Sequence, residues 1–200
     1  MHYKLYITDL DGTMYFQLPV RICMTCELLA YYILHPLKLR DIAIIQKYRC
    51  YHEQETTCNM AYFAQKNKVD EKYATELINE WMQKRPLKWI KFFADKKLLN
   101  LLENKQVVVF SDYPTEDKLK ALNFEPYGQY YCDNKNIYQR KPCAEGLEYI
   151  QQKYKLQKSE MLMIGDRLAY DGKCAENFGC DYVILSSNYL KRQKQYSRLL

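Results

Sequence analysis

The sequence of 200 residues lacks the features that mark several classes of protein. Six glycines and six prolines exclude collagen-like and low-complexity chains. No apolar run approaches the ~18 residues that a membrane-spanning helix needs, and the longest covers only residues 28–34. The first residues are strand-like and lack the charged and apolar regions of a signal peptide. We therefore expect a soluble, cytoplasmic protein with no membrane partner.

The charge is moderately positive, with a formal net charge of +6. The lysines are scattered, and no segment resembles a DNA-reading helix or an aromatic and basic platform, so we expect no nucleic-acid partner. The tail carries Lys191, Arg192, Lys194 and Arg198 without an acidic residue, and we interpret it as solvated. Basic residues between positions 15 and 105 would help to attract an anionic substrate.

The eight cysteines are expected to be free thiols in such a protein. Cys23 and Cys26 form a C-x-x-C pair, and Cys50, His52 and Cys58 follow, so a zinc site is one interpretation. The pair lies in a helix-like segment, however, and no glycine follows either cysteine. Packing in the protein interior is therefore the favoured role.

Short runs of β-forming residues alternate with helical patterns over much of the chain. We predict strands over residues 3–8, 106–110, 161–164 and 181–185, and helices over 116–122, 143–155 and from 167 to about 178. This order predicts an α/β fold with a doubly wound, parallel, Rossmann-like sheet. Three of the strands end at Asp9, Ser111 and Asp166. The carboxyl ends of parallel strands share one edge, which is where such folds bind ligands.

A helical region interrupts this pattern after the first strand. Apolar periodicity and breakers predict helices over residues 20–34, 37–52 and 59–65, from Asp70 to about 85, and over 87–104. We therefore assign residues 1–14 and 105–200 to an α/β core and 15–104 to an inserted helical domain. Met14, Tyr15 and Phe16 mark the expected hinge.

Two carboxylates follow the first strand, in the motif Asp9-Leu10-Asp11-Gly12-Thr13. Residues two apart in a strand point to the same side, and Gly12 allows the backbone to turn. One carboxylate can then attack phosphorus while its neighbour transfers protons. A simple Asp-Gly turn is the alternative.

Four further polar residues follow the other predicted strands or precede helices. The Ser111 hydroxyl can bind a phosphoryl oxygen, and Lys141 can neutralise its charge. Asp166 directly follows a strand, with Asp171 about one helical turn beyond. Carboxylate oxygens suit Mg²⁺. Taken singly, a structural serine, a solvated lysine and a capping aspartate are the ordinary alternatives.

The order of these motifs resembles that of the haloacid dehalogenase superfamily over the whole chain. Its first motif matches Asp9-Leu10-Asp11-Gly12-Thr13, and its other three match Ser111, Lys141, and Gly165-Asp166 with Asp171. The resemblance implies that the inserted helices form a cap over the active site.

The resemblance also implies a role for each motif residue. Asp9 would be the nucleophile and a metal ligand, and Asp11 the general acid/base and a metal ligand through its backbone carbonyl. Ser111 and Lys141 would bind phosphate. Asp166 would complete the ligands of Mg²⁺, and Asp171 would support that site from behind.

The same resemblance implies a Mg²⁺-dependent phosphatase of small phosphorylated metabolites. Superfamily enzymes that dehalogenate carbon lack an acid at the position of Asp11. Basic residues of the cap such as Arg21, Lys38 and Arg40 are candidates for substrate contact, although each is also an ordinary surface residue.

Two alternatives use a similar set of residues. A sugar-phosphate mutase would use the same Asp9 and Asp11 but would move phosphate instead of releasing it. A receiver-like signalling module also has an acidic pocket, but its phosphorylated aspartate ends a later strand and no helical insertion follows it. The sequence leaves open whether Asp112 enters the site.

Overall fold

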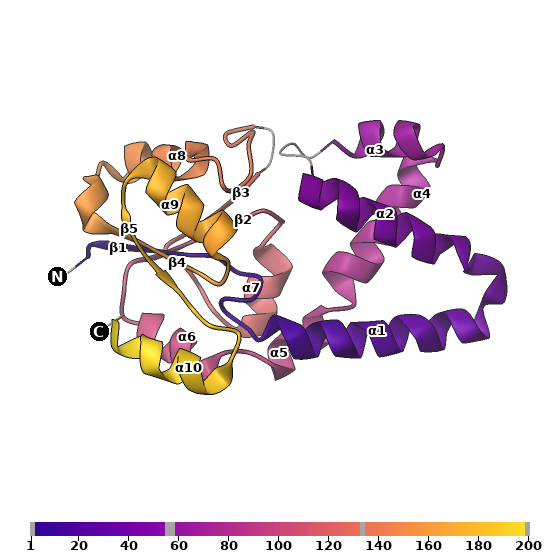
Figure 1. Cartoon of the computed structure of the whole chain (residues 1–200), viewed down its shortest axis with the longest axis horizontal. Coiled ribbons are helices and arrows are strands. Elements are labelled where there is room, and N and C mark those ends of the chain that lie inside the picture. The colour runs from indigo at the N-terminus through magenta and orange to yellow at the C-terminus, as the bar shows by residue number, and fades with distance from the viewer. Residues whose placement is uncertain (1–2, 55–58, 133–134, 199–200) are drawn as a thin grey trace.

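The computed structural model describes residues 3–54, 59–132 and 135–198 and contains a five-stranded parallel sheet. The strands are ordered β3-β2-β1-β4-β5. Their bounds are β1 Leu5–Thr8, β2 Val107–Ser111, β3 Gly128–Tyr131, β4 Met161–Gly165 and β5 Asp181–Ile184. The prediction of an α/β class with a doubly wound parallel sheet is confirmed (Figure 1).

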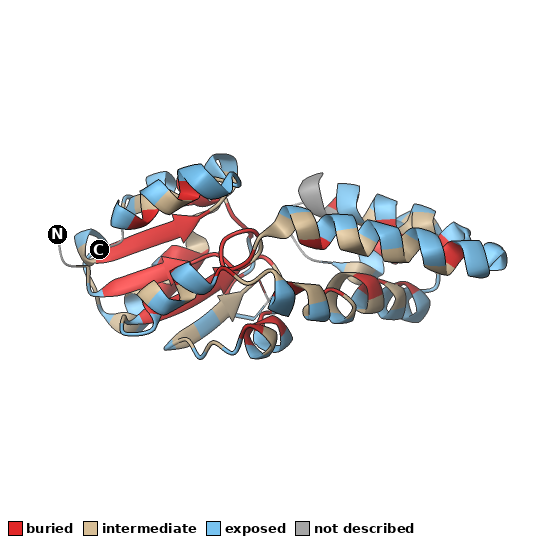
Figure 2. Cartoon of the chain, turned by 90° about the horizontal axis from the view of Figure 1, so that it is seen from below, coloured by how far each residue is buried: buried red, intermediate tan, exposed pale blue. Residues whose placement is uncertain are grey.

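The central position of β1 brings the predicted functional strand ends together. Thr8, its last residue, is in register with Val109 of β2 and Ile164 of β4. Every residue of β1, β2 and β4 is buried, as Figure 2 shows. Side chains that follow these three strands therefore meet at one edge of the sheet.

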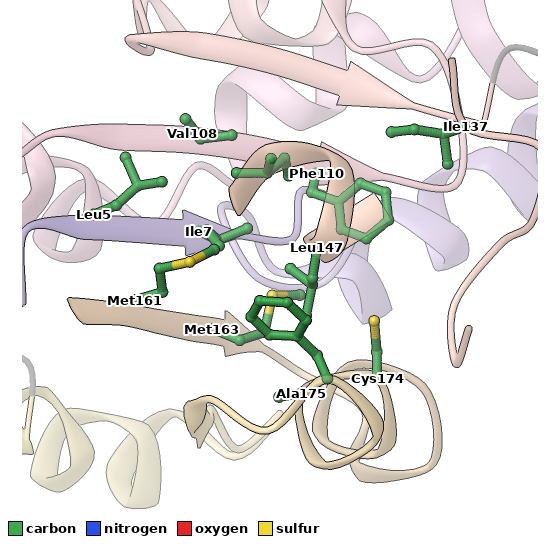
Figure 3. Close-up of a cluster of buried hydrophobic side chains, with 12 residues drawn as sticks. Leu5, Ile7, Val108, Phe110, Ile137, Leu147, Met161, Met163, Cys174 and Ala175 are labelled. Carbon is green, nitrogen blue, oxygen red and sulfur yellow. The ribbon is translucent and has the colours of Figure 1, made fainter. Parts of the chain in front are cut away.

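Helices cover both faces of the sheet. On one face lie α8 (Glu145–Tyr154) and α9 (Lys173–Phe178), and on the other α6 (Lys96–Leu102) and α10 (Tyr189–Gln195) (Figure 1). α7 (Glu116–Leu122) follows β2. Figure 3 shows the core on the first face, where Ile7, Phe110, Met163 and Leu147 pack together.

The domain boundary predicted at residue 104 places α6 with the inserted helices, but α6 packs against the sheet. Leu98 and Leu102 of α6 are buried in one cluster with Tyr6 and Leu162 of the sheet. Since the side chains of α6 complete the core under the sheet, we group this helix with the sheet rather than with the inserted helices.

The remaining inserted helices extend to one side of the sheet (Figure 1). They are α1 Gln17–Leu34, η1 Pro36–Lys38, α2 Arg40–Gln54, α3 Met60–Asn67, α4 Glu71–Ile78, the π-helix η2 Asn79–Lys84, and α5 Leu87–Phe92. They have a small core of their own around Tyr32, Ile45, Ile78 and Trp81.

Two neighbouring segments join these helices to the sheet. Tyr15 forms an antiparallel bridge with Ala94, the Phe16 N–H donates to the Phe93 carbonyl at 3.0 Å, and the Asp95 N–H donates to the Met14 carbonyl at 2.9 Å. The residues predicted as the hinge are thus paired with the returning segment, and Met14 and Tyr15 are buried.

Short helical turns complete the fold: η3 Lys158–Glu160, the π-helix η4 Leu168–Gly172, and η5 Tyr196–Arg198. Among the described residues, no helix is both long and apolar enough to cross a bilayer. The cytoplasmic location stays a prediction.

Candidate active site

The loop after β1 places Asp9 and Asp11 at the edge of the sheet. The Asp9 N–H donates to the Ile164 carbonyl of β4 at 2.8 Å, and its side chain accepts from Thr13 Oγ1 at 3.3 Å. Gly12 adopts a φ of +94°, and a Cβ at this position would lie 2.2 Å from Asp166 Oδ2. Glycine is therefore required both for the turn and for the close approach of Asp166.

Lys141 lies at the centre of the predicted residues. Its ammonium group is buried and donates to Asp9 Oδ1 at 2.5 Å and to Asp171 Oδ1 at 2.7 Å. Burial alone would lower the pKa of Lys141, but Asp171, Asp9 and Asp112 outweigh it and raise the pKa well above its usual value. Lys141 is therefore a permanent positive charge beside Asp9.

Three carboxylates converge next to this lysine. Oxygens of Asp9, Asp166 and Asp171 lie within 4.8 Å of one another. Burial, followed by the charge of Asp171, raises the pKa of Asp166 to about 6. Burial also raises the pKa of Asp9 well above its usual value. The charges of Asp171, Asp166 and Asp11 add to this shift, and the charge of Lys141 opposes it.

The same cluster fits a divalent cation. Asp166 Oδ1 is buried and has no hydrogen-bond partner among the described residues, and Arg167 Nε is 3.9 Å away, too far to donate. A buried carboxylate oxygen without a partner is costly unless a ligand satisfies it. Oxygen donors of this kind suit Mg²⁺.

Asp171 has most of its hydrogen-bonding capacity in use. Its Oδ2 accepts from the backbone N–H groups of Asp166 and Arg167, at 3.2 and 3.1 Å, while Oδ1 accepts from Lys141. A Cβ on residue 165 would lie 2.3 Å from Asp171 Cβ, so Asp171 can pack this closely only because residue 165 is a glycine. Asp171 thus orients both Lys141 and the loop that carries Asp166.

Ser111 and Asp112 lie at the end of β2. Ser111 is buried, and its hydroxyl accepts from the Tyr113 N–H at 3.3 Å. Asp112 Oδ1 accepts from the Lys141 N–H at 3.2 Å, and Oδ2 lies 3.8 Å from Arg167 Nη2. The carboxylate of Asp112 therefore lies beside the site and holds the backbone of Lys141.

Lys118 of α7 is a site residue that the sequence analysis did not identify. Its ammonium group donates to both oxygens of Asp11, at 2.8 and 2.9 Å, and the Tyr15 hydroxyl donates to the same carboxylate. Burial alone would raise the pKa of Asp11, but Lys118 and Tyr15 outweigh it and lower the pKa.

Arg192 corrects the interpretation of the C-terminal tail as solvated. Its side chain is buried and forms an ion pair with Asp95, with Nε 2.7 Å from Oδ2. Its other nitrogens donate to the backbone carbonyls of Gly12 and Thr13. The first helix of the tail, α10, therefore holds the loop that carries Asp11.

A cavity of about 430 Å³ lies between this edge of the sheet and the inserted helices, and we call it the central cavity. Asp9, Asp11, Ser111 and Lys141 line it on the side of the sheet. Residues of α1, α2 and η2 line the opposite side.

Of the three basic candidates for substrate contact, only one is among the residues that line the central cavity. Arg21 of α1 is part of its wall. Lys38 instead donates to the Tyr31 hydroxyl at 3.4 Å, and Arg40 begins α2 with an exposed side chain.

The cysteines considered for zinc lie mainly on helices. Cys23 and Cys26 are in α1 and Cys50 is in α2, all with free thiols. Cys23 is half-buried, whereas Cys26 and Cys50 are exposed, so the prediction of interior packing is wrong for these two. The side chain of His52 and the whole of Cys58 lie outside the described residues.

Comparison with known proteins identifies the family. A family model described as haloacid dehalogenase-like hydrolase matches residues 6–185. Curated protein sequences give no match.

Solved structures share the fold of this chain. YfnB from Bacillus subtilis, assigned as a HAD-hydrolase and bound to magnesium, is 14% identical with a TM-score of 0.60, over 92% of this chain and 89% of its own. A protein from Lactobacillus plantarum assigned as a phosphoglycolate phosphatase is 14% identical with a TM-score of 0.56, over 91% and 86%. L-2-haloacid dehalogenase from Xanthobacter autotrophicus is 12% identical with a TM-score of 0.61, over 96% and 81%.

Proposed function

Because the chain belongs to the haloacid dehalogenase-like hydrolases, we propose that it is a Mg²⁺-dependent phosphatase that hydrolyses phosphate monoesters. The observation that carries this choice is a second carboxylate, Asp11, which lines the central cavity together with Asp9. Cleavage of a phosphate ester needs a group that transfers a proton to the leaving oxygen, and Asp11 supplies one.

The first half of the reaction uses Asp9 and Asp11 together. A carboxylate oxygen of Asp9 attacks phosphorus, a new P–O bond forms, and the bond from phosphorus to the ester oxygen breaks. The lowered pKa of Asp11 leaves only a small fraction of the enzyme with this carboxyl protonated. In that fraction Asp11 gives its proton to the ester oxygen, so a neutral alcohol leaves. Lys141, 2.5 Å from Asp9 Oδ1, stabilises the negative charge that develops around phosphorus.

The second half returns the enzyme to its starting state. Asp11, now a carboxylate, takes a proton from water, and the water oxygen attacks phosphorus. The bond between phosphorus and Asp9 breaks, which releases inorganic phosphate and restores the Asp9 carboxylate. Lys118 and Tyr15 hold Asp11 in place through both halves.

Mg²⁺ would be held by the side chains of Asp9 and Asp166 and by the backbone carbonyl of Asp11. Asp171 would position Asp166 by accepting a hydrogen bond from its backbone N–H. When bound, the ion supplies positive charge that offsets the clustered carboxylates and the phosphate oxygens. The partnerless Oδ1 of Asp166 supports this assignment.

The test is phosphate release from a panel of phosphate monoesters, with Mg²⁺ and with a chelator. We expect release by the wild type with Mg²⁺ only, and a loss of at least about a thousandfold in Asp9→Asn, because the nucleophile is removed. Asp117→Asn changes an exposed aspartate of α7 and should retain full activity. Chloride release from 2-chloropropionate without phosphate release would instead establish a dehalogenase, and phosphate moved within a bisphosphate would establish a mutase.

A further inference from the structure

The wall of the central cavity opposite Asp9 carries arginines nearer to the sheet and becomes mainly apolar farther from it. Arg21, Met24 and Leu28 follow one another along the cavity side of α1, about one helical turn apart. α1 runs away from the sheet (Figure 1), so Arg21 is nearest to the sheet and Leu28 is farthest from it.

α2 repeats this order in the opposite direction. This helix returns toward the sheet (Figure 1), and its cavity residues are Ile42 and Ile45 followed by Gln46 and Arg49. Arg49 therefore lies at the end of α2 nearer to the sheet. The two helices together place Arg21 and Arg49 nearer to the sheet than Leu28 and Ile42. The part of the wall farther from the sheet is mainly apolar, although Thr25 and Gln46 also line the cavity.

The far part of the cavity has an apolar wall that belongs to a packed core. Met24, Leu28 and Ile42 pack in the cluster around Ile45 and Trp81, which also lines the cavity. From residue 20 to residue 28, α1 rises by ~12 Å, at ~1.5 Å per residue. The volume of about 430 Å³ is well above what a phosphate group alone would need.

We propose, on the basis of the phosphatase function above, that the preferred substrates are phosphate monoesters of an apolar alcohol, with a medium-length alkyl chain. The phosphate would lie beside the paired Asp9 and Lys141, and Arg21 and Arg49 line the cavity wall opposite them. The chain would lie along Met24, Leu28 and Ile45. A small polar ester such as phosphoglycolate would leave this apolar wall in contact with water, so its binding would gain nothing from it.

The experiment compares straight-chain alkyl phosphates from ethyl to octyl, and phosphoglycolate, under identical conditions with Mg²⁺. We expect kcat/KM to rise at least about tenfold from ethyl to octyl phosphate, mainly through a lower KM, because each buried methylene adds binding free energy. Phosphoglycolate should be hydrolysed less efficiently than octyl phosphate.

A pair of neighbouring leucines in α1 provides the matched control. Leu28 is half-buried and lines the cavity, whereas Leu29 is 54% exposed and does not line it. Leu28→Gln should reduce the ratio of octyl to ethyl kcat/KM by several-fold, while Leu29→Gln should leave the ratio at its wild-type value.

The outcomes separate this inference from the proposed function. Equal efficiency for all chain lengths, a preference for phosphoglycolate, or equal effects of the two leucine variants would overturn the inference and leave a phosphatase.

If no ester is hydrolysed, the proposed function fails, and the binding of octylphosphonate is then compared with that of ethylphosphonate by calorimetry. Tighter binding of octylphosphonate, lost in Leu28→Gln, would support the apolar subsite even so, and equal binding would overturn it.

Discussion

At the scale of single residues, two buried cations organise the loop after β1. Lys118 binds the carboxylate of Asp11, and Arg192 binds the carbonyls of Gly12 and Thr13. Neither side chain is more than 6% exposed. Lys118 holds the side chain of Asp11 and Arg192 holds the backbone that follows it, so the position of the proton-transferring group depends on residues far apart in the sequence.

The ion pair of Lys118 and Asp11 leads to a prediction about stability and pH. Lys118→Met leaves a buried carboxylate without its cation, and we expect it to cost about 3 kcal/mol at pH 7. The pKa of Asp11 is lowered in the fold. The stabilisation is therefore present above the unfolded pKa of about 3.9 and is lost as the pH falls through the lower folded value.

Urea denaturation with a chelator present, between about pH 7 and pH 3, measures this difference. Lys120→Met is the control, since Lys120 is on the same helix, 80% exposed, and 3.9 Å from Asp117. Its cost should stay below about 0.5 kcal/mol at every pH. A cost of Lys118→Met that equals the control, or that does not shrink in acid, would show that the pair adds no stability.

The spacing of residues in the sequence could have identified Lys118 as a buried lysine, but it could not have shown which carboxylate Lys118 binds. Thr115, Lys118, Leu119 and Leu122 are all buried, and their spacing is that of the apolar face of a helix. A lysine on such a face must have a buried partner. Which carboxylate it meets depends on how α7 packs against the loop after β1, and a single sequence does not carry that information.

At the scale of secondary-structure elements, the strands with continuous apolar runs were predictable and β3 was not. β1, β2, β4 and β5 begin and end within two residues of their predicted bounds. β1, β2 and β4 are fully buried and consist mainly of β-forming apolar residues, and β5, although only partly buried, keeps the apolar run Tyr-Val-Ile. β3 has the sequence Gly-Gln-Tyr-Tyr and is only partly buried at the edge of the sheet. Its short, mixed pattern gives no periodic signal.

α10 is the element whose role the sequence concealed. Its basic residues suggested a solvated helix face, yet Arg192 is buried against Asp95, the residue that caps α6 by accepting from the Leu98 N–H at 3.1 Å. The Tyr196 hydroxyl donates to the same carboxylate. One aspartate thus connects α10, α6 and the segment that returns from the inserted helices.

This connection predicts a strong coupling between Arg192 and Asp95. Arg192→Met should reduce the free energy of unfolding by about 3 to 5 kcal/mol, because the buried charge of Asp95 then lacks its partner. Lys191→Met, at the exposed neighbouring position, should change it by less than about 0.5 kcal/mol. The double variant Arg192→Met with Asp95→Asn should cost clearly less than the sum of the two single variants in urea denaturation. Simple additivity would show that the two residues act independently.

At the scale of the whole molecule, the sequence predicted which residues meet but not the shape of the space in front of them. Asp9, Ser111 and Lys141 all line the central cavity, as expected from the shared edge of the parallel strands. The apolar wall of that cavity depends on the relative positions of α1, α2 and η2. Met24 and Ile45 look like ordinary core residues in the sequence, and only their arrangement distinguishes the cavity side of each helix.

The distribution of charge gives a prediction for the whole molecule. The protein has a net charge of +6, and Arg21, Arg49 and Arg167 line the central cavity. An anionic ester should therefore be attracted into the cavity, and salt should screen this attraction. We expect kcat/KM for p-nitrophenyl phosphate to fall about tenfold between about 20 and 300 mM KCl, with little change in kcat.

Two arginines of α2 distinguish local attraction from overall charge. Arg49 lines the cavity and Arg40 does not. Nine residues of helix separate them by ~14 Å, which exceeds the Debye length of about 10 Å at 0.1 M salt. Arg49→Gln should therefore weaken the dependence of kcat/KM on salt clearly more than Arg40→Gln, which makes the same change in net charge, and the two variants should differ most at about 0.1 M salt and above. Equal effects of the two variants would mean that net charge alone attracts the substrate, and an absence of salt dependence in the wild type would mean that electrostatic attraction does not limit substrate capture.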